Sequence, residues 1–148
     1  GRGLLAVGEW LSPVDAVIAH SLGSPAALHA FAHGLRTRSS VHLAGPSSLN
    51  RALDRTACAV GVSGIELRAR FEELTGLDAS AMELERLAAG MRHRALLLHD
   101  PLDPEVHWSE SAALANAWDG AVLEAANGVG HRRIIGDYAV IERILAFL

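Results

Sequence analysis

Lysine is absent from the 148-residue chain, so all 13 of its basic residues are arginines. They are scattered along the sequence among 17 acidic residues, and the net charge is −4. Binding to the phosphate backbone of a nucleic acid needs a concentrated basic face, and no segment of the sequence supplies one. We therefore expect no nucleic-acid partner.

Cysteine and long apolar runs are also scarce. The single cysteine, Cys58, cannot form an intrachain disulfide, which fits a reducing compartment. No apolar run approaches the roughly 18 residues that cross a bilayer, and no basic segment followed by an apolar one opens the chain. We expect a soluble, cytoplasmic protein without a membrane span. The opening Gly1-Arg2-Gly3 resembles a cut within a longer protein more than a natural start.

Short apolar runs of strand length alternate with segments of helical periodicity. Half of the residues are hydrophobic, which suffices for one domain with a sizeable core. The pattern predicts strands at 14–19, 40–44, 94–99 and 121–125, with helices at 3–11, 24–33, 109–118 and 137–148. This alternation predicts the α/β class, with a parallel sheet of about four strands and flanking helices. We interpret the long helical stretch 47–91, between the second and third strands, as a cap-like insert in a single domain that spans 1–148.

A serine stands where the first predicted strand turns into a helix. The local sequence AHSLG, residues 19–23, is close to G-x-S-x-G, with Ala19 in place of the first glycine. Small residues on both sides of Ser21 fit a sharp turn that lifts the serine Oγ above the sheet. The helix N-terminus behind it offers N–H groups to a developing oxyanion, first that of Leu22. The same position also suits an ordinary helix cap, so the motif alone leaves both roles open.

Two later loops carry an acid and a base. The third predicted strand is followed by HDPLDPEV, which contains Asp100 and Asp103, and the fourth by NGVGH, which delivers His131. Loops that follow parallel strands emerge at the same edge of the sheet, where α/β proteins bind ligands. We therefore expect Ser21, one of the two aspartates and His131 to lie together.

The segments AHSLGSPAA, ALLLHDPLDPEV and GVGHRRII together resemble the C-terminal portion of the α/β-hydrolase superfamily, in its esterase/lipase-like branch. The resemblance implies a serine hydrolase that acts on an ester or related acyl substrate, with Ser21 as nucleophile, Asp103 as acid and His131 as base. The family's acid usually lies a few residues beyond the strand, which favours Asp103 over Asp100. The resemblance also implies an oxyanion hole that includes the Leu22 N–H, and no cofactor.

The same resemblance implies a truncated fold. The family has several strands before the nucleophile strand, and one of their loops supplies the second oxyanion donor. Only one predicted helix precedes Val14, so strand 14–19 would form an exposed apolar edge. We expect either a piece of a longer hydrolase or a homodimer that pairs at this edge. A non-catalytic, hydrolase-like scaffold for binding or assembly is the alternative function.

Two histidines at helical spacing raise the question of a metal site. His29 and His33 are four residues apart, as metal ligands on a helix often are. No glutamate follows His29 as in H-E-x-x-H, and no third ligand is apparent. We interpret the pair as partly exposed surface histidines and expect no metal.

Overall fold

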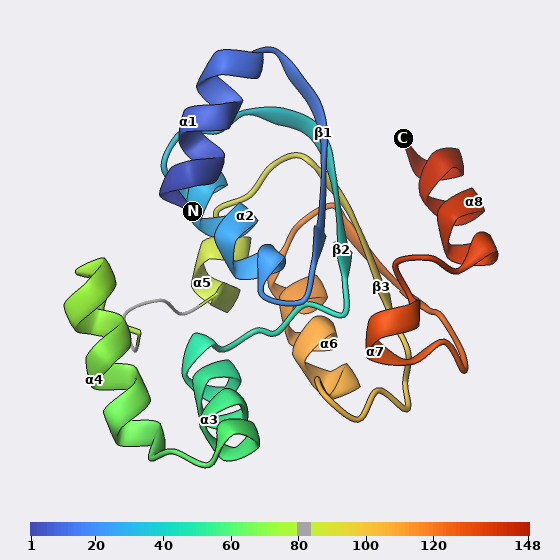
Figure 1. Cartoon of the computed structure of the whole chain (residues 1–148). Coiled ribbons are helices and arrows are strands. Elements are labelled where there is room, and N and C mark those ends of the chain that lie inside the picture. Colours follow the sequence, from blue (N-terminus) through green and yellow to red (C-terminus); the bar gives the residue numbers. More distant parts are fainter. Residues whose placement is uncertain (80–83) are drawn as a thin grey trace.

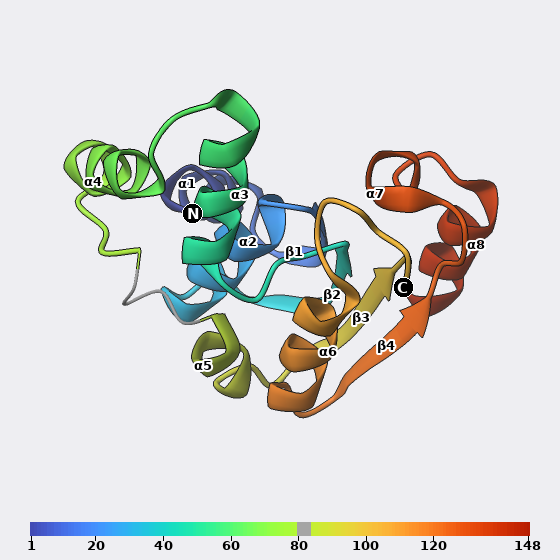
Figure 2. The ribbon, with the colours of Figure 1, turned by 90° about the horizontal axis from the view of Figure 1, so that it is seen from below.

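Four parallel strands form the sheet of this computed structural model, which describes residues 1–79 and 84–148. The strands β1 (Val14–His20), β2 (Thr37–Leu43), β3 (Arg94–His99) and β4 (Ala121–Ala125) lie side by side in chain order (Figure 1 and Figure 2). The predicted fold class is confirmed. β2 starts earlier than predicted, because its polar beginning already pairs with β1: Thr37 is the partner of Val14, and Ser39 that of Ala16.

One face of the sheet is covered by α2 (Gly23–Ala32), α5 (Leu84–Ala89) and α6 (Trp108–Ala117), and α1 (Arg2–Leu11) packs on α2. Figure 2 shows these helices on the side of the sheet opposite to α8. Side chains of β1 and β3 meet the helices in one apolar cluster, which includes Val17, Leu28, Leu84, Leu97 and Trp118. Burying this cluster supplies the main hydrophobic stabilisation of this face.

On the other face, α8 (Tyr138–Phe147) and the short α7 (Gly130–Arg133) cover β2 and β3, whereas Ile18 of β1 and Val122 of β4 remain about half exposed. Alternate residues of a strand point to opposite faces, so Leu96 and Leu98 of β3 join Ile134, Val140 and Ile144 in a second cluster. Asp137 caps α8 by accepting a hydrogen bond from the Val140 N–H. The result is a sheet between two helical layers.

The stretch expected to form a cap divides into two parts. The helices α3 (Leu49–Val60) and α4 (Gly64–Thr75) pack mainly against each other, and α4 buries none of its residues. Figure 1 shows this pair standing off the carboxyl ends of the strands. In contrast, α5 buries Leu84 and Ala88 against the sheet layer. We call α3 and α4 the helical arm.

β1 lies at one edge of the sheet. Within residues 1–79 and 84–148, it pairs only with β2, and Ile18 on this strand is 54% exposed. No helix in the described part of the chain is long and apolar enough to cross a membrane.

Candidate active site

Ser21 occupies a tight turn directly after β1. Its N–H donates to the Leu43 carbonyl at 2.9 Å, and its own carbonyl accepts from the Ser24 N–H at 3.0 Å as α2 begins. Its φ is +51°, in the left-handed region that costs a non-glycine residue about 1–2 kcal/mol. A Cβ added at Gly23 would meet the Ala19 Cβ at 3.8 Å, so the two small residues face each other across the turn. Backbone strain of this kind concentrates at functional sites.

His131 joins the serine to an acid. Its Nε2 accepts from the Ser21 hydroxyl at 2.9 Å, and its Nδ1 donates to Oδ2 of Asp103 at 2.8 Å. The three side chains follow β1, β3 and β4 and meet at the carboxyl edge of the sheet. The hydrogen-bond network assigns this tautomer, with the proton on Nδ1. Of the two aspartates considered from the sequence, the structure places Asp103 against His131.

The carboxylate of Asp103 is buried and fully occupied. Its Oδ1 accepts from the backbone N–H groups of Glu105 at 2.7 Å and Val106 at 3.0 Å. Burial is the largest influence on this group and raises its pKa. The hydrogen bonds from Val106, His131 and Glu105 together outweigh burial and hold the pKa of Asp103 below its ordinary value. The residue is therefore a fixed anion at neutral pH.

Asp100 accepts hydrogen bonds from the backbone of two loops. Its Oδ1 accepts from the Leu102 N–H at 3.0 Å, and its Oδ2 accepts from the Gly130 N–H at 2.6 Å. Gly130 directly precedes His131, so Asp100 ties the loop after β3 to the loop that carries the histidine.

A second histidine contacts Asp103, and sequence reasoning did not assign it a role. The Nε2 of His99 donates to the Val106 carbonyl at 2.9 Å and lies 3.2 Å from Asp103 Oδ2, while Nδ1 lies 2.7 Å from the Ser111 hydroxyl. Burial lowers the pKa of His99, which keeps the ring neutral. His99, buried in the core, thus stabilises the Asp103 loop through its hydrogen bond to the Val106 carbonyl. Its only sequence signal was its place four residues before Asp103.

His20 supports His131 from the nucleophile strand. Its Nε2 donates to the His131 carbonyl at 2.8 Å, and the two rings lie 4.9 Å apart between centroids. This contact fixes the backbone of His131 relative to the end of β1.

A cleft of about 510 Å³ opens beside Ser21 and His131. α3 of the helical arm lines one wall, and Pro104, Glu105 and Val106 of the loop after β3 line the other. This volume lies within the 300–1,000 Å³ that is typical of small-molecule sites.

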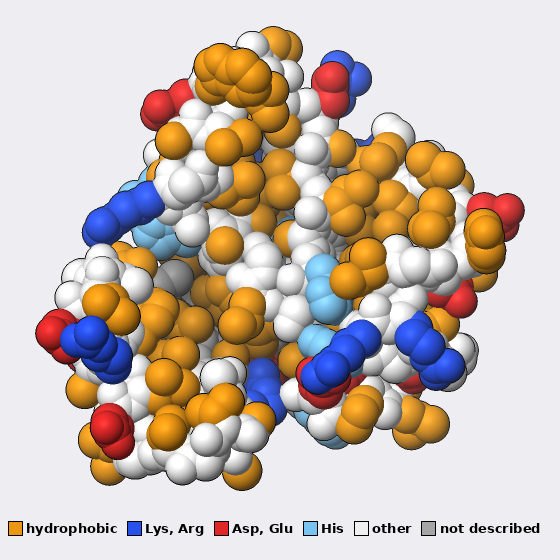
Figure 3. Space-filling view, viewed as in Figure 1, with side chains coloured by type: hydrophobic (Ala, Val, Ile, Leu, Met, Phe, Trp, Pro, Cys, Tyr) orange, Lys and Arg blue, Asp and Glu red, His pale blue; other side chains and the backbone are white. Residues whose placement is uncertain are grey.

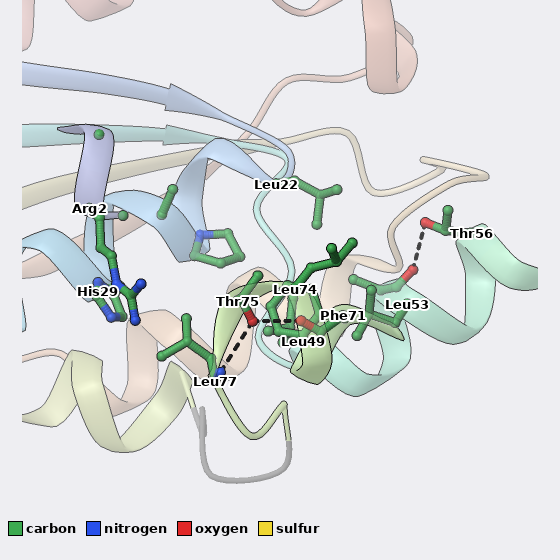
Figure 4. A pocket seen from close by; sticks show the side chains of 15 residues that line it. Arg2, Leu22, His29, Leu49, Leu53, Thr56, Phe71, Leu74, Thr75 and Leu77 are labelled. Atoms are coloured by element: carbon green, nitrogen blue, oxygen red, sulfur yellow. Dashed lines mark hydrogen bonds between the residues drawn. The ribbon is translucent and has the colours of Figure 1, made fainter. Parts of the chain in front are cut away.

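A second cavity, of about 540 Å³, adjoins the cleft at the tight turn 20–23 that carries Ser21, which we call the elbow. Both spaces share Leu22, Ala52 and Thr56 as lining residues. In Figure 4, Leu22 from the elbow and Leu53, Phe71 and Leu74 from the helical arm gather around this cavity. Figure 3 shows hydrophobic side chains along the hollow between the helical arm and the sheet. The lining is mostly apolar.

The expectation of two partly exposed histidines on α2 is wrong for His29, which is 7% exposed. The rings of His29 and His33 stack 4.0 Å apart, and His33 Nδ1 donates to the His29 carbonyl at 2.7 Å. Gly1 at the start of α1 also lies against the His29 ring, and burial lowers its pKa. Among residues 1–79 and 84–148, no group of three or more His, Cys, Asp and Glu side chains could hold a metal ion.

Comparison with known proteins identifies the fold. No protein-family model and no curated protein sequence matches the chain. Solved structures do match. The esterase domain of a Rhodothermus marinus protein is 22% identical, with a TM-score of 0.68 over 87% of this chain. The esterase EaEST from Exiguobacterium antarcticum is 12% identical, with a TM-score of 0.72 over 98%. Est1E from Butyrivibrio proteoclasticus, solved with ferulic acid, is 18% identical, with a TM-score of 0.69 over 97%.

This chain covers 57%, 70% and 66% of those three structures, respectively. Likeness at such low identity establishes architecture, whereas chemistry is a property of the site. The chain therefore has the α/β-hydrolase fold and spans part of the length of its structural relatives.

Proposed function

We propose that the protein is a serine hydrolase that cleaves a carboxylic ester through an acyl-enzyme on Ser21. The observation that carries this proposal is the position of His131, whose two ring nitrogens contact the Ser21 hydroxyl and the Asp103 carboxylate. A nucleophile, a base and an orienting acid in this arrangement are the requirements for acyl transfer. The esterases among the structural neighbours agree with this chemistry.

His131 is the general base in this mechanism. As Ser21 Oγ attacks the ester carbonyl, its proton passes to His131 Nε2, and the resulting imidazolium is stabilised by Asp103. His131 then gives this proton to the departing alcohol, which leaves an acyl group on Ser21. Water, deprotonated by the same histidine, releases the acid and restores the serine.

The start of α2 would stabilise the negative charge that develops on the substrate carbonyl oxygen. The carbonyl oxygen becomes an oxyanion during attack, and we assign the Leu22 N–H as one donor to it. The N-terminus of α2 adds the partial positive charge of a helix start. Asp103 is held away from this oxygen, on the far side of His131.

The helical arm serves as the cap in this proposal, and the apolar cavity holds the acyl chain. Its lining by Leu22, Leu53, Phe71 and Leu74 suits a hydrocarbon group, and it adjoins the elbow where the acyl carbonyl must sit. The cleft beside His131 then receives the alcohol, since that histidine must protonate it.

A fluorophosphonate probe with mass-spectrometric mapping tests this function. We expect modification at Ser21 in the unaltered chain and none in Ser21→Ala or His131→Ala. His107→Ala is the matched control, because His107 is exposed and its Nδ1 contacts the N–H and the hydroxyl of Ser109 at the start of α6, away from Ser21. A folded protein without a modified Ser21 would overturn the hydrolase and favour the non-catalytic scaffold.

A further inference from the structure

Arg55 brings a charge into the proposed alcohol-binding cleft. The other cleft-lining residues of α3 are small or uncharged, namely Ala52, Thr56, Cys58 and Ala59. Among the described residues that line the cleft, Glu105 is the only other Arg, Asp or Glu, and Arg132 pairs with it at 2.8 Å. Arg55 therefore supplies the positive charge on the cleft wall that α3 forms.

Arg55 is anchored but only partly neutralised. Its Nη1 donates to Glu110 Oε1 at 2.6 Å, and Glu110 is a buried residue of α6. The same carboxylate accepts from the Ser47 N–H at 2.9 Å and lies 3.7 Å from Arg51 Nε. The single negative charge of Glu110 thus lies close to two guanidinium groups, so Arg51, Arg55 and Glu110 together carry a net positive charge. A guanidinium has five N–H donors, so Arg55 retains donors for a ligand in the cleft.

The position of His131 identifies the part of the substrate that meets Arg55. The cleft contains both His131 and Arg55, whereas the apolar cavity contains neither. We infer that Arg55 binds a carboxylate on the alcohol portion of the ester, so that the protein selects esters of anionic hydroxy compounds over neutral ones. This inference rests on the proposed function, which places the alcohol portion of the ester in the cleft and the acyl portion in the apolar cavity.

The physical basis is a charge-assisted hydrogen bond. Guanidinium–carboxylate contacts are among the strongest that side chains make, and the planar fork of arginine suits two parallel bonds. Glu110 holds Arg55 in place before substrate arrives, which reduces the entropy that binding must overcome. The loss of such a contact corresponds to about 10- to 100-fold in affinity.

Two esters that differ in one charge provide the test: 4-(butanoyloxy)benzoate and its methyl ester. Arg55→Gln is the test variant. Arg51→Gln is the matched control, because Arg51 contacts the same Glu110 carboxylate but does not line the cleft. The ratio of kcat/KM values for the two esters is compared between variants, which cancels their different intrinsic reactivities. Equilibrium binding of both esters is measured in parallel in a Ser21→Ala background.

We expect Arg55→Gln to lower kcat/KM and affinity for the anionic ester by about 10- to 100-fold, with changes below about threefold for the methyl ester. Arg51→Gln should leave the ratio unchanged. Equal effects of Arg55→Gln on both esters, or binding of neither, would overturn the inference. Absent turnover together with an Arg55-dependent binding difference would overturn the hydrolase while supporting Arg55 as the carboxylate site.

Discussion

Asp103→Asn replaces one carboxylate oxygen of the proposed triad by an NH₂ group and removes the negative charge. In the wild-type chain, the Oδ1 of Asp103 accepts from two backbone N–H groups, those of Glu105 and Val106, and Oδ2 faces His131. An asparagine can keep its oxygen on the backbone side or on the histidine side. The second choice would point its NH₂ group at two N–H donors, each of which costs about 1–3 kcal/mol when left unpaired. The backbone therefore directs the NH₂ group toward His131.

This orientation switches the tautomer of the histidine. Because the side-chain amide in the Asp103→Asn variant donates to Nδ1, His131 must carry its proton on Nε2 and can no longer accept the proton of Ser21. The expected loss in kcat is about 10⁴-fold, the size that accompanies this change in a serine triad. Both backbone hydrogen bonds remain, but the new NH₂ group also faces the buried Nε2–H of His99, which lies 3.2 Å from Oδ2 in the wild-type chain, so we expect a stability loss of about 1–3 kcal/mol. The assay is kcat for 4-nitrophenyl butanoate, with thermal unfolding of the same samples.

Asp100→Asn is the matched control. Each oxygen of Asp100 accepts one backbone N–H, from Leu102 or from Gly130, so the amide must leave one of them unpaired. We expect a cost of about 1–3 kcal/mol in stability and a loss of activity of about tenfold or less. The assignment of Asp103 as the acid would be refuted by a larger kcat loss in Asp100→Asn than in Asp103→Asn.

Three further predictions concern strain, pH and the sheet edge. Ser21→Gly should be more stable than Ser21→Ala by about 1 kcal/mol in urea unfolding, because glycine adopts a φ of +51° without strain. Neither variant should react with fluorophosphonate. Equal stabilities of the two variants would count against strain at the elbow. Burial lowers the pKa of His42 from 6.5 to about 3. Between pH 6.5 and 5, the unfolded chain therefore takes up a proton at His42 that the folded chain does not, and this difference should lower the free energy of unfolding by about 2 kcal/mol. The stabilisation is complete above pH 6.5 and is lost toward pH 3, and urea unfolding at pH 7 and pH 5 should show a smaller difference in His42→Leu. Of the two arrangements expected for the exposed edge of β1, the homodimer predicts a dimer in light scattering that Ile18→Lys returns to the monomer. A monomer at several hundred micromolar would contradict the homodimer.

The sheet could be predicted because its signals are local. Apolar runs fix the centres of all four strands, and β3 and β4 begin and end where those runs do. β2 begins at Thr37 and not at Ser40, because its first residues are held by backbone pairing with β1, which depends on another part of the chain. The approach of Ser21, Asp103 and His131 followed from the sheet itself, since loops after parallel strands share an edge.

The supporting contacts could not be predicted, because each joins residues far apart in sequence. Glu110 lies on α6, and its partner Arg55 lies 55 positions earlier on α3. His20 bonds a carbonyl 111 positions away. No periodicity or motif marks such pairs, which depend on how helices pack once the sheet has formed. The burial of His29 was missed for the same reason, since Gly1, 28 positions earlier, lies against its side chain.

The arrangement separates chemistry from recognition. The proposed catalytic side chains follow β1, β3 and β4. Backbone N–H groups of its own loop hold Asp103, and a hydrogen bond from His20 to its carbonyl holds His131. The proposed recognition side chains, Arg55 and Phe71, belong to the helical arm, of which α4 buries no residue. Segments with few buried contacts open more easily and tolerate substitution better than core strands. In this arrangement, the helical arm can change the substrate that is accepted while the serine keeps its base and its acid. Glu110 is where the two parts meet, because it fixes Arg55 to a helix that packs on the sheet.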